Sequence, residues 1–223
     1  MELYDVMRTT FAAREFTDEP VPDSAIYSIL DNARFAPSGG NRQGWRVIVI
    51  REPATREAMI PMMMPTFQRY FAQAQAGEAP WNTIHPTRLS EADIAAAEAP
   101  ESFIRRIAEA PVVLLVLLDL SVVASFDAEL DRVGVISGAS IYPFVWNILL
   151  AARNEGYGGT PTTFVAAREQ ELRTLLGIPE HLAVAALMPL GRPVKQLTRL
   201  TRKPVEAFAM RERWDGPPLR EDG

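Results

Sequence analysis

The feature that most constrains the fold of this chain is a set of three largely apolar runs, at 45–50, where Arg46 is the exception, and at 112–118 and 182–190. Short runs of consecutive apolar residues predict strands that are covered by other elements on both faces. The sequence therefore predicts a buried sheet. The residues 47–50 are apolar on both faces, which predicts a central position for the first strand.

Helical patterns separate these predicted strands. Apolar residues recur every three or four positions over 3–11, and a second helix begins at Pro22 and ends before Pro37. A further helix over 168–176 stops at Gly177. This order of elements suggests an α+β sandwich, in which helices flank a central mixed β-sheet. A chain of 223 residues suits a single domain.

Residues 127–154 form the pattern of one long helix that is apolar nearly all round. Such a helix must be buried on every side, and a chain of this size has difficulty covering it alone. We therefore expect a homodimer. Pro143 predicts a kink in this helix, and Gly156 marks its end.

Residues 53–110 contain prolines at positions 53, 61, 65, 80, 86 and 100, which break long elements. We expect short helices and a lid-like insertion here. The residues 62–64, which are all Met, lie close in sequence to Phe67, Tyr70 and Phe71, and two interpretations stay open. These side chains line a pliable pocket for a planar ligand, or they pack as ordinary local core.

The chain contains no cysteine, and its two histidines are His85 and His181. Disulfides, thiolate catalysis and cysteine-ligated metal centres are therefore excluded, and we expect no metal site. Any redox reaction must then use a bound cofactor.

Charge is distributed unevenly along the chain, whose net charge is −5. Residues 192–223 form a C-terminal extension with eight Lys or Arg and five Asp or Glu. The net charge of the extension is therefore +3, and that of the remainder is −8. The acidic remainder argues against a nucleic-acid partner, whereas the short basic extension suits one small anion.

The N-terminal residues Met1–Asp5 lack the basic and then apolar pattern of a signal peptide. The longest apolar run, 112–118, is far shorter than the ~20 residues that span a bilayer. We expect a cytoplasmic protein with no membrane partner.

Several common enzyme motifs are missing. No G-x-G-x-x-G follows a predicted strand, and neither a P-loop nor a G-x-S-x-G nucleophile elbow occurs. The remaining candidates are groups at the ends of predicted elements: Arg8, Arg14, the loop 38–43, the turn 158–160 and Arg202. Arginines can clamp a phosphate and glycine-rich loops can present N–H groups to a planar ring, which together suit FMN. In the alternative interpretation, the arginines are solvated and the glycines only turn the chain.

Four motifs of this chain, the last of which has two parts, resemble motifs of the nitroreductase family and follow one another in the family's order. The segment A-P-S-G-G-N-R-Q-G-W over 36–45 is similar to the family's A-P-S-x-x-N-x-Q-P-W. R-E-F-T-D-E-P-V-P over 14–22 is similar to the family's R-x-F-x-x-x-P-V-P. N-I-L-L-A-A over 147–152, followed by a glycine-rich turn, resembles N-L-x-L-A-A…G-x-G-x. L-G-R-P over 190–193 and R-K-P over 202–204 resemble its closing signals.

The resemblance implies a nitroreductase-like fold and an FMN-dependent homodimer, in which residues of both chains hold each flavin at the subunit interface. It implies these cofactor-binding residues: Arg8, Thr10, Arg14, Pro37, Ser38, Asn41, Gln43, Gly158, Gly159, Thr160 and Arg202. Arg14, Thr10 and Arg202 would hold the phosphate and ribityl chain, with Arg8 nearby. The loop 38–43 would contact the ribityl chain and the ring, and the turn 158–160 would donate to the N5 and O4 edge.

The activity that the resemblance implies is hydride transfer from NAD(P)H, through flavin N5, to a nitroaromatic, a quinone or a related conjugated acceptor. The implied mechanism is ping-pong, and no side chain serves as catalytic acid, base or nucleophile, because the flavin carries the chemistry.

The sequence departs from the family pattern at two places, and two alternatives to the implied activity stay open. Gly44 replaces a proline, which loosens the turn, and the segment 10–14 lacks an arginine and a serine that are common FMN contacts. A specialised member of the family, such as a dehalogenase, a flavin-cleaving enzyme or an enone reductase, is one alternative. A flavin-binding protein without turnover is the other.

Overall fold

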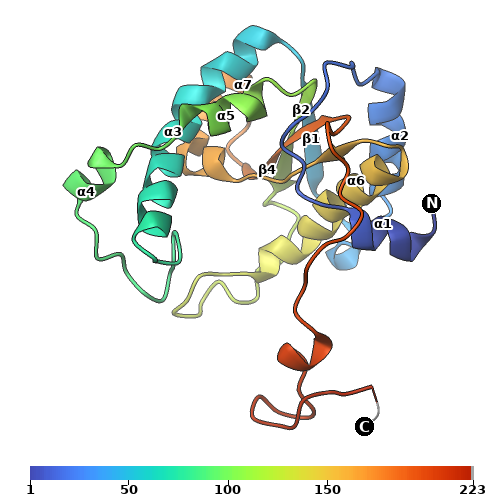
Figure 1. Ribbon diagram of the computed structural model, residues 1–223, viewed down its shortest axis with the longest axis vertical. Helices are drawn as coiled ribbons and strands as arrows, with labels where there is room; N and C mark the ends of the chain where they lie inside the picture. Colours follow the sequence, from blue (N-terminus) through green and yellow to red (C-terminus); the bar gives the residue numbers. More distant parts are fainter. Residues whose placement is uncertain (222–223) are drawn as a thin grey trace.

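A sheet of four strands lies at the centre of the protein, within the residues 1–221 that the computed structural model describes. The strands are β1 (Trp45–Ile50), β2 (Val112–Asp119), β3 (Gly158–Gly159) and β4 (Leu182–Gly191), and their order is β1-β2-β4-β3 (Figure 1). The three apolar runs are therefore strands, and the predicted α+β fold is confirmed. Asp222 and Gly223, which end the C-terminal extension, lie outside the described residues.

The sheet differs from the prediction in two respects. The pairs β1–β2, β2–β4 and β3–β4 are all antiparallel, and the parallel pairing expected of a mixed sheet occurs at the isolated bridge between Ala12 and Gly159. The predicted central position of β1 is wrong, since this strand lies at an edge and its Val49 is 41% exposed. An apolar run predicts that side chains are covered, but it does not identify the neighbouring strands.

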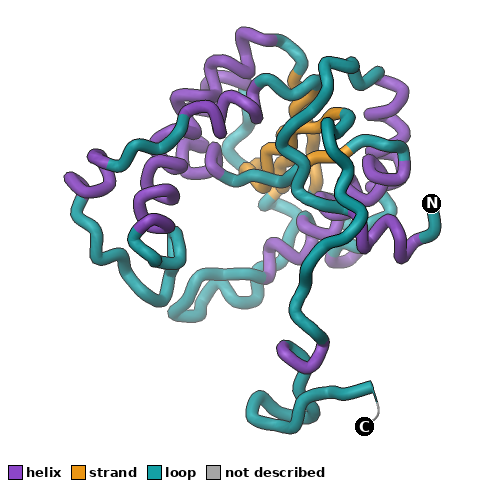
Figure 2. Tube along the Cα trace, viewed as in Figure 1, coloured by secondary structure: helices purple, strands orange, loops and turns teal. Residues whose placement is uncertain are grey.

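Helices cover both faces of the sheet (Figures 1 and 2). The helices are α1 (Leu3–Thr9), α2 (Asp23–Ala33), α3 (Pro53–Gln75), α4 (Glu91–Ala96), α5 (Glu101–Ala108), α6 (Tyr142–Asn154) and α7 (Glu169–Leu176). Short 3-10 helices occur at Gly39–Asn41, Ile136–Ser140, Phe164–Arg168 and Val205–Ala207. Within residues 1–221, none of the helices is long and apolar enough to cross a membrane.

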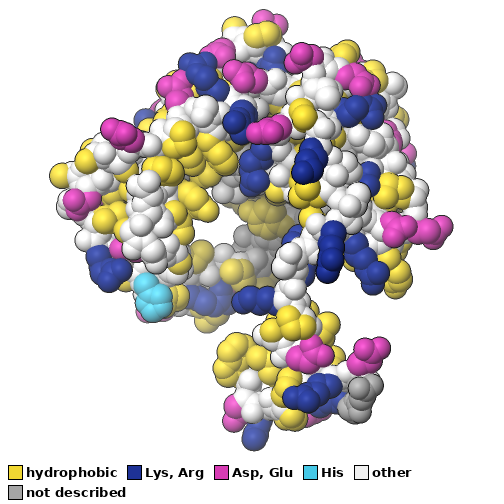
Figure 3. All heavy atoms as spheres, viewed as in Figure 1, with side chains coloured by type: hydrophobic (Ala, Val, Ile, Leu, Met, Phe, Trp, Pro, Cys, Tyr) yellow, Lys and Arg dark blue, Asp and Glu magenta, His cyan; other side chains and the backbone are white. Residues whose placement is uncertain are grey.

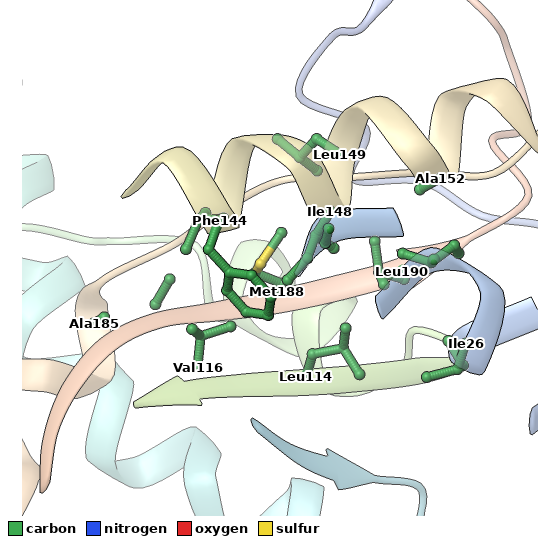
Figure 4. Packing of buried hydrophobic residues seen from close by; sticks show 14 of the residues in the cluster. Ile26, Leu114, Val116, Phe144, Ile148, Leu149, Ala152, Ala185, Met188 and Leu190 are labelled. Atoms are coloured by element: carbon green, nitrogen blue, oxygen red, sulfur yellow. The ribbon is translucent and has the colours of Figure 1, made fainter. Parts of the chain in front are cut away.

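Strand β2 separates two hydrophobic cores, and each of its residues is buried. Leu114 and Val116 face α2 and α6, whereas Leu115 and Leu117 face α3, α5 and α7. Successive side chains of a strand point to opposite faces, so one apolar strand supplies both cores. In the first core, Phe144 and other residues of α6 lie against β4 (Figure 4).

Residues 53–75 form one long helix, α3, where the prolines predict short helices, so that prediction is wrong. Pro61 and Pro65 lie inside the helix, and both are exposed. A proline has no N–H to donate to the carbonyl group four residues earlier. Because residues four apart lie on the same side of a helix, these two carbonyl groups are on the solvent side, where water can reach them. The opposite side of α3 buries Met59 and Met63, and this packing favours the helix despite the prolines.

The same helix decides between the two interpretations of the Met and aromatic cluster. Met63 and Phe67 are buried in the second core, and Phe67 stacks on Phe103 with ring centroids 4.8 Å apart. The interpretation as core packing is confirmed for these residues. Tyr70 is 42% exposed and lines a cavity.

The long helix predicted over 127–154 is wrong in its first half, because α6 begins at Tyr142 and the preceding residues form turns and a short 3-10 helix. Pro143 lies in the first turn of α6, where a proline starts a helix rather than kinks it. Before it, the carboxylate of Asp127 accepts hydrogen bonds from the backbone N–H of Val135 at 2.7 Å and from Arg132 at 2.8 Å. These bonds fold the segment into a loop.

The C-terminal extension leaves the body of the protein (Figures 1 and 2). It runs away from the sheet without regular structure, apart from the single turn at Val205–Ala207. Near its end, a short pairing between Met210 and Pro218 closes a small loop, on which Trp214 is 86% exposed. Its first residues still pair with the N-terminal segment, since Val194 donates its N–H to the carbonyl oxygen of Glu15 at 3.1 Å and Gln196 donates to that of Thr9 at 3.0 Å. Beyond Leu197, the hydrogen bonds of the described residues stay within the extension.

Candidate functional site

The N-terminal segment lies against the glycine-rich turn. The backbone N–H of Ala13 donates to the carbonyl oxygen of Gly159 at 3.0 Å. A Cβ atom on Gly158 would lie 3.1 Å from the Cβ of Ala13, and one on Gly159 would lie 2.4 Å from Cδ2 of Leu190. Glycine is therefore required here because the two segments and β4 approach so closely.

This contact forms one side of a cavity of about 490 Å³, which lies between the turn, α3 and α5. The cavity is lined by Arg14, Thr66, Tyr70, Pro80, Trp81, Phe103, Ile107, Thr160, Pro161, Thr162, Thr163, Phe164, Ala166 and Ala167. The space-filling view shows the molecule hollowed between the lobe that contains α3 and α4 and the rest of the protein (Figure 3). Its lining is mainly aromatic and apolar, as in sites that bind planar organic molecules.

Thr162 places an unused hydroxyl group in the lining of the cavity. Its backbone is paired with Leu187 in both directions, at 2.8 Å each, and the residue is 9% exposed. Its Oγ1 is buried and has no hydrogen-bond partner among the described residues. A buried polar atom of this kind normally has a partner, so the position suits a ligand that offers a donor or an acceptor.

Arg14 is the charged residue of the lining. One of its terminal nitrogens donates to the carbonyl oxygen of Ala12 at 3.3 Å, and the guanidinium lies 5.8 Å from the centroid of the Phe103 ring. Neither contact neutralises the charge, so the guanidinium can pair with an anionic part of a ligand. With the hydroxyl of Thr162 and the glycine-rich turn, this donor set fits FMN.

A loop at 76–90 closes one side of the cavity through Pro80 and Trp81. The loop is tied together by Glu78, whose carboxylate accepts from the hydroxyl of Thr87 at 2.5 Å and from the backbone N–H of Arg88 at 2.8 Å. These hydrogen bonds, that of Thr87 first, lower the pKa of Glu78 below its usual value. The loop is thus ordered by an ionised carboxylate.

The loop 38–43, which the sequence predicts to bind the cofactor, does not line this cavity. Ser38 accepts the backbone N–H of Gln43 at 3.0 Å, and the side chain of Gln43 donates to Asn41 Oδ1 at 3.2 Å. The loop is anchored on Ser140, whose Oγ accepts the N–H of Gly39 at 3.1 Å. Its backbone is strained, with positive φ at Asn41 and Gln43, and neither these residues, Pro37 nor Ser38 lines the cavity.

Of the other residues predicted to bind the cofactor, some lie at the cavity and others do not. Thr160 lines the cavity and Gly159 lies beside it. Thr10 is buried and its hydroxyl donates to the carbonyl oxygen of Val6 at 2.7 Å, while the Arg8 guanidinium lies 5.8 Å from the Tyr4 ring. Neither Arg8 nor Thr10 lines the cavity.

Arg202 lies on the C-terminal extension, away from the cavity. It is exposed, and it donates to the carbonyl oxygen of the neighbouring Thr201 at 2.8 Å. Within one chain, the structure therefore brings together Arg14 and the turn 158–160, but not the loop 38–43 or Arg202.

The lining residues that the site prediction missed include Trp81, Phe103, Thr162 and Phe164. Thr162 had a signal, since it follows the glycine-rich turn by two residues. The aromatic residues had none, because they come from elements that only the tertiary structure brings together.

The arrangement of helices and antiparallel strands defines the fold class. A structure of an iodotyrosine deiodinase bound to FMN and 3-iodo-L-tyrosine matches with a TM-score of 0.66 at 24% identity, covering 92% of this chain and 96% of that chain. This likeness shows a shared fold.

The chain belongs to the nitroreductase family, whose sequence model matches residues 7–192. A nitrobenzene nitroreductase from Ectopseudomonas oleovorans is 30% identical over 209 residues, covering 84% of this chain and 85% of that protein. An NADH dehydrogenase from Thermus thermophilus is 29% identical over 200 residues, covering 88% of this chain and 89% of that protein.

Proposed function

We propose that this protein is an FMN-dependent oxidoreductase that uses NAD(P)H to reduce a nitroaromatic, a quinone or a related conjugated acceptor. The observation that supports this most directly is the cavity that Arg14, Thr160 and Thr162 line, where the buried hydroxyl of Thr162 has no partner among residues 1–221. Family membership and the names of the relatives point to the same class of reaction.

When bound, FMN supplies the redox chemistry, a two-electron exchange between NAD(P)H and the acceptor. The residues of this chain bind and orient the participants. Arg14 offers a positive charge to an anionic part of the ligand, and Thr162 offers a hydroxyl group. Aromatic residues such as Phe103 and Phe164 exclude water from the cavity, which strengthens these polar contacts.

A second copy of the chain supplies the residues that one chain keeps apart. The loop 38–43 and Arg202 lie away from the cavity of their own chain, so their proposed contacts with FMN need a homodimer. Exposed apolar residues are available to form it, among them Tyr4 on α1 and Val135 in the loop before α6, at 69% and 64% exposure. Burying such residues in an interface is favourable, so a dimer completes both the surface and the site.

The test is a visible spectrum of the purified protein, followed by anaerobic titration with NADH and with NADPH. We expect flavin absorbance that bleaches with one of the nucleotides and returns on addition of nitrobenzene. Arg14→Ala should raise the dissociation constant for FMN about tenfold or more, because a charge-assisted contact is lost. Arg34→Ala, an exposed change directly after α2, is the matched control. A wild-type protein without flavin, or one that neither nucleotide bleaches, would exclude the proposed function.

A specialised dehalogenase is the second candidate. It is favoured by the iodotyrosine deiodinase from Nematostella vectensis, which is 26% identical over 207 residues, covering 92% of this chain and 73% of that protein. Release of iodide from 3-iodo-L-tyrosine at a rate above that of nitrobenzene reduction would support this candidate against the first.

A further inference from the structure

We propose that Trp81 is the residue that determines acceptor specificity, and that it stacks on an uncharged aromatic ring rather than on an amino acid that carries an ammonium group. This inference rests on the proposed function and names the class of acceptor that the same cavity takes. Trp81 lies in the loop 76–90, which joins α3 to α4.

Trp81 is held in an unfavourable backbone conformation. Its φ is +53°, in the left-handed region that bulky residues avoid. The backbone N–H donates to Oε1 of Gln73 at 3.0 Å, and Gln73 is a polar residue that is only 4% exposed. The indole Nε1–H donates to the carbonyl oxygen of Thr66 at 3.3 Å. Strain that the surroundings maintain in this way is typical of residues that act on a ligand.

The position of the indole ring suits stacking. The guanidinium of Arg69 lies 5.0 Å from the ring centroid. This cation–π contact covers part of the ring's surface. The residue nevertheless stays 47% exposed and lines the cavity. An aromatic ring that is fixed at its backbone and at its N–H loses little freedom when it binds a flat ligand.

The remaining lining favours an uncharged acceptor. Within the described residues, the lining contains hydroxyl groups, aromatic rings and Arg14, but no carboxylate. An ammonium group placed there would lose its water without gaining a carboxylate partner from this lining. A nitroarene or a quinone carries no such group, so its transfer into the cavity avoids this penalty.

The experiment measures binding to the purified, oxidised protein without any reductant. Equilibrium dialysis gives the dissociation constants of nitrobenzene and of 3-iodo-L-tyrosine, and tryptophan emission reports whether Trp81 contacts the ligand. We expect wild-type protein to bind nitrobenzene more tightly than 3-iodo-L-tyrosine. Trp81→Leu should weaken nitrobenzene binding about tenfold, because the stacked ring is lost. Trp81→Phe should keep the affinity within about threefold, since a phenyl ring still stacks.

The control is Trp214→Leu, which removes an exposed tryptophan on the C-terminal extension. Nitrobenzene should quench tryptophan emission in the wild type and in Trp214→Leu, and this quenching should largely disappear in Trp81→Phe. Unchanged nitrobenzene affinity in a folded Trp81→Leu variant, quenching that persists in Trp81→Phe, or tighter binding of 3-iodo-L-tyrosine would each overturn the inference. Protein that contains no flavin would contradict the proposed function instead, so the two failures are distinguishable.

Discussion

The backbone N–H of Ala13 and the carbonyl oxygen of Gly159 form a hydrogen bond of 3.0 Å that joins the N-terminal segment to the glycine-rich turn. Arg14 and Thr160 are the next residues along each segment, and both line the cavity. One backbone contact thus sets the separation of two side chains that come from distant parts of the sequence.

Gly159→Ala should destabilise the protein by about 2–3 kcal/mol, in the upper part of the range expected for overpacking a buried position. The added Cβ would lie 2.4 Å from Cδ2 of Leu190 and 2.5 Å from the carbonyl oxygen of Pro189, which belongs to the backbone of β4. Urea denaturation at fixed protein concentration measures the change. Gly39→Ala is the control, because its Cβ meets only Oγ of Ser140, at 3.5 Å. Equal denaturation midpoints for the two variants would refute the prediction.

Arg202 should act on the cavity of the partner chain. Arg14→Ala and Arg202→Ala should each reduce FMN retention, and random mixing of the two unfolded variants before refolding should restore it at about a quarter of the sites. Half of all dimers then contain one copy of each variant, and in each of these one site contains both substitutions and the other contains neither. Flavin absorbance after gel filtration gives the occupancy. Failure of mixing to restore any flavin would place Arg202 at the cavity of its own chain or at no flavin site.

Asp127→Asn should lower the melting temperature at neutral pH by a few degrees, and the difference from wild type should shrink in acid. The backbone N–H of Val135 and then the side chain of Arg132 lower the pKa of Asp127 below its usual value near 3.8. The folded state therefore favours the ionised carboxylate. Its contribution to the stability of the protein is complete above the usual pKa near 3.8, and it is lost as the pH falls toward the lowered pKa of the folded state. Calorimetry between pH 3 and pH 7 tests this, with the exposed Asp131→Asn as the control. A difference that does not depend on pH would contradict the role of the charge.

Pro61→Ala should stabilise the protein by about 1–2 kcal/mol, because an alanine restores an N–H donor inside α3. The gain is smaller than the intrinsic difference between the two residues, since the proline also restricts the unfolded chain. Pro53→Ala, in the first turn of the same helix, should have little effect or a slightly unfavourable one. Thermal unfolding of both variants distinguishes these outcomes, and a loss of stability in Pro61→Ala would mean that the proline helps α3 to pack.

The three long strands and several helix ends could be predicted from the sequence, because their signals are local. The residues 45–50 form a strand with the predicted bounds, and Gly177 ends α7 with φ +65°, as a glycine after a helix is expected to do. The motifs around Arg14 and Thr160 also identified one side of the cavity.

The errors arose where a local signal competes with long-range packing. Pro61 and Pro65 oppose a long helix, and only the core against which α3 packs decides the outcome. Asp127 has no sequence signal of its loop, because its N–H partners are fixed by the tertiary structure.

The sequence by itself determined the α+β class, the family and the residues of the glycine-rich turn, since each depends on the order of neighbouring residues. The tertiary structure alone decided that β1 lies at an edge, that Trp81 and Thr162 line one cavity, and that Arg202 does not line it. These facts depend on contacts between distant segments, whose geometry is set by the packing of the whole chain.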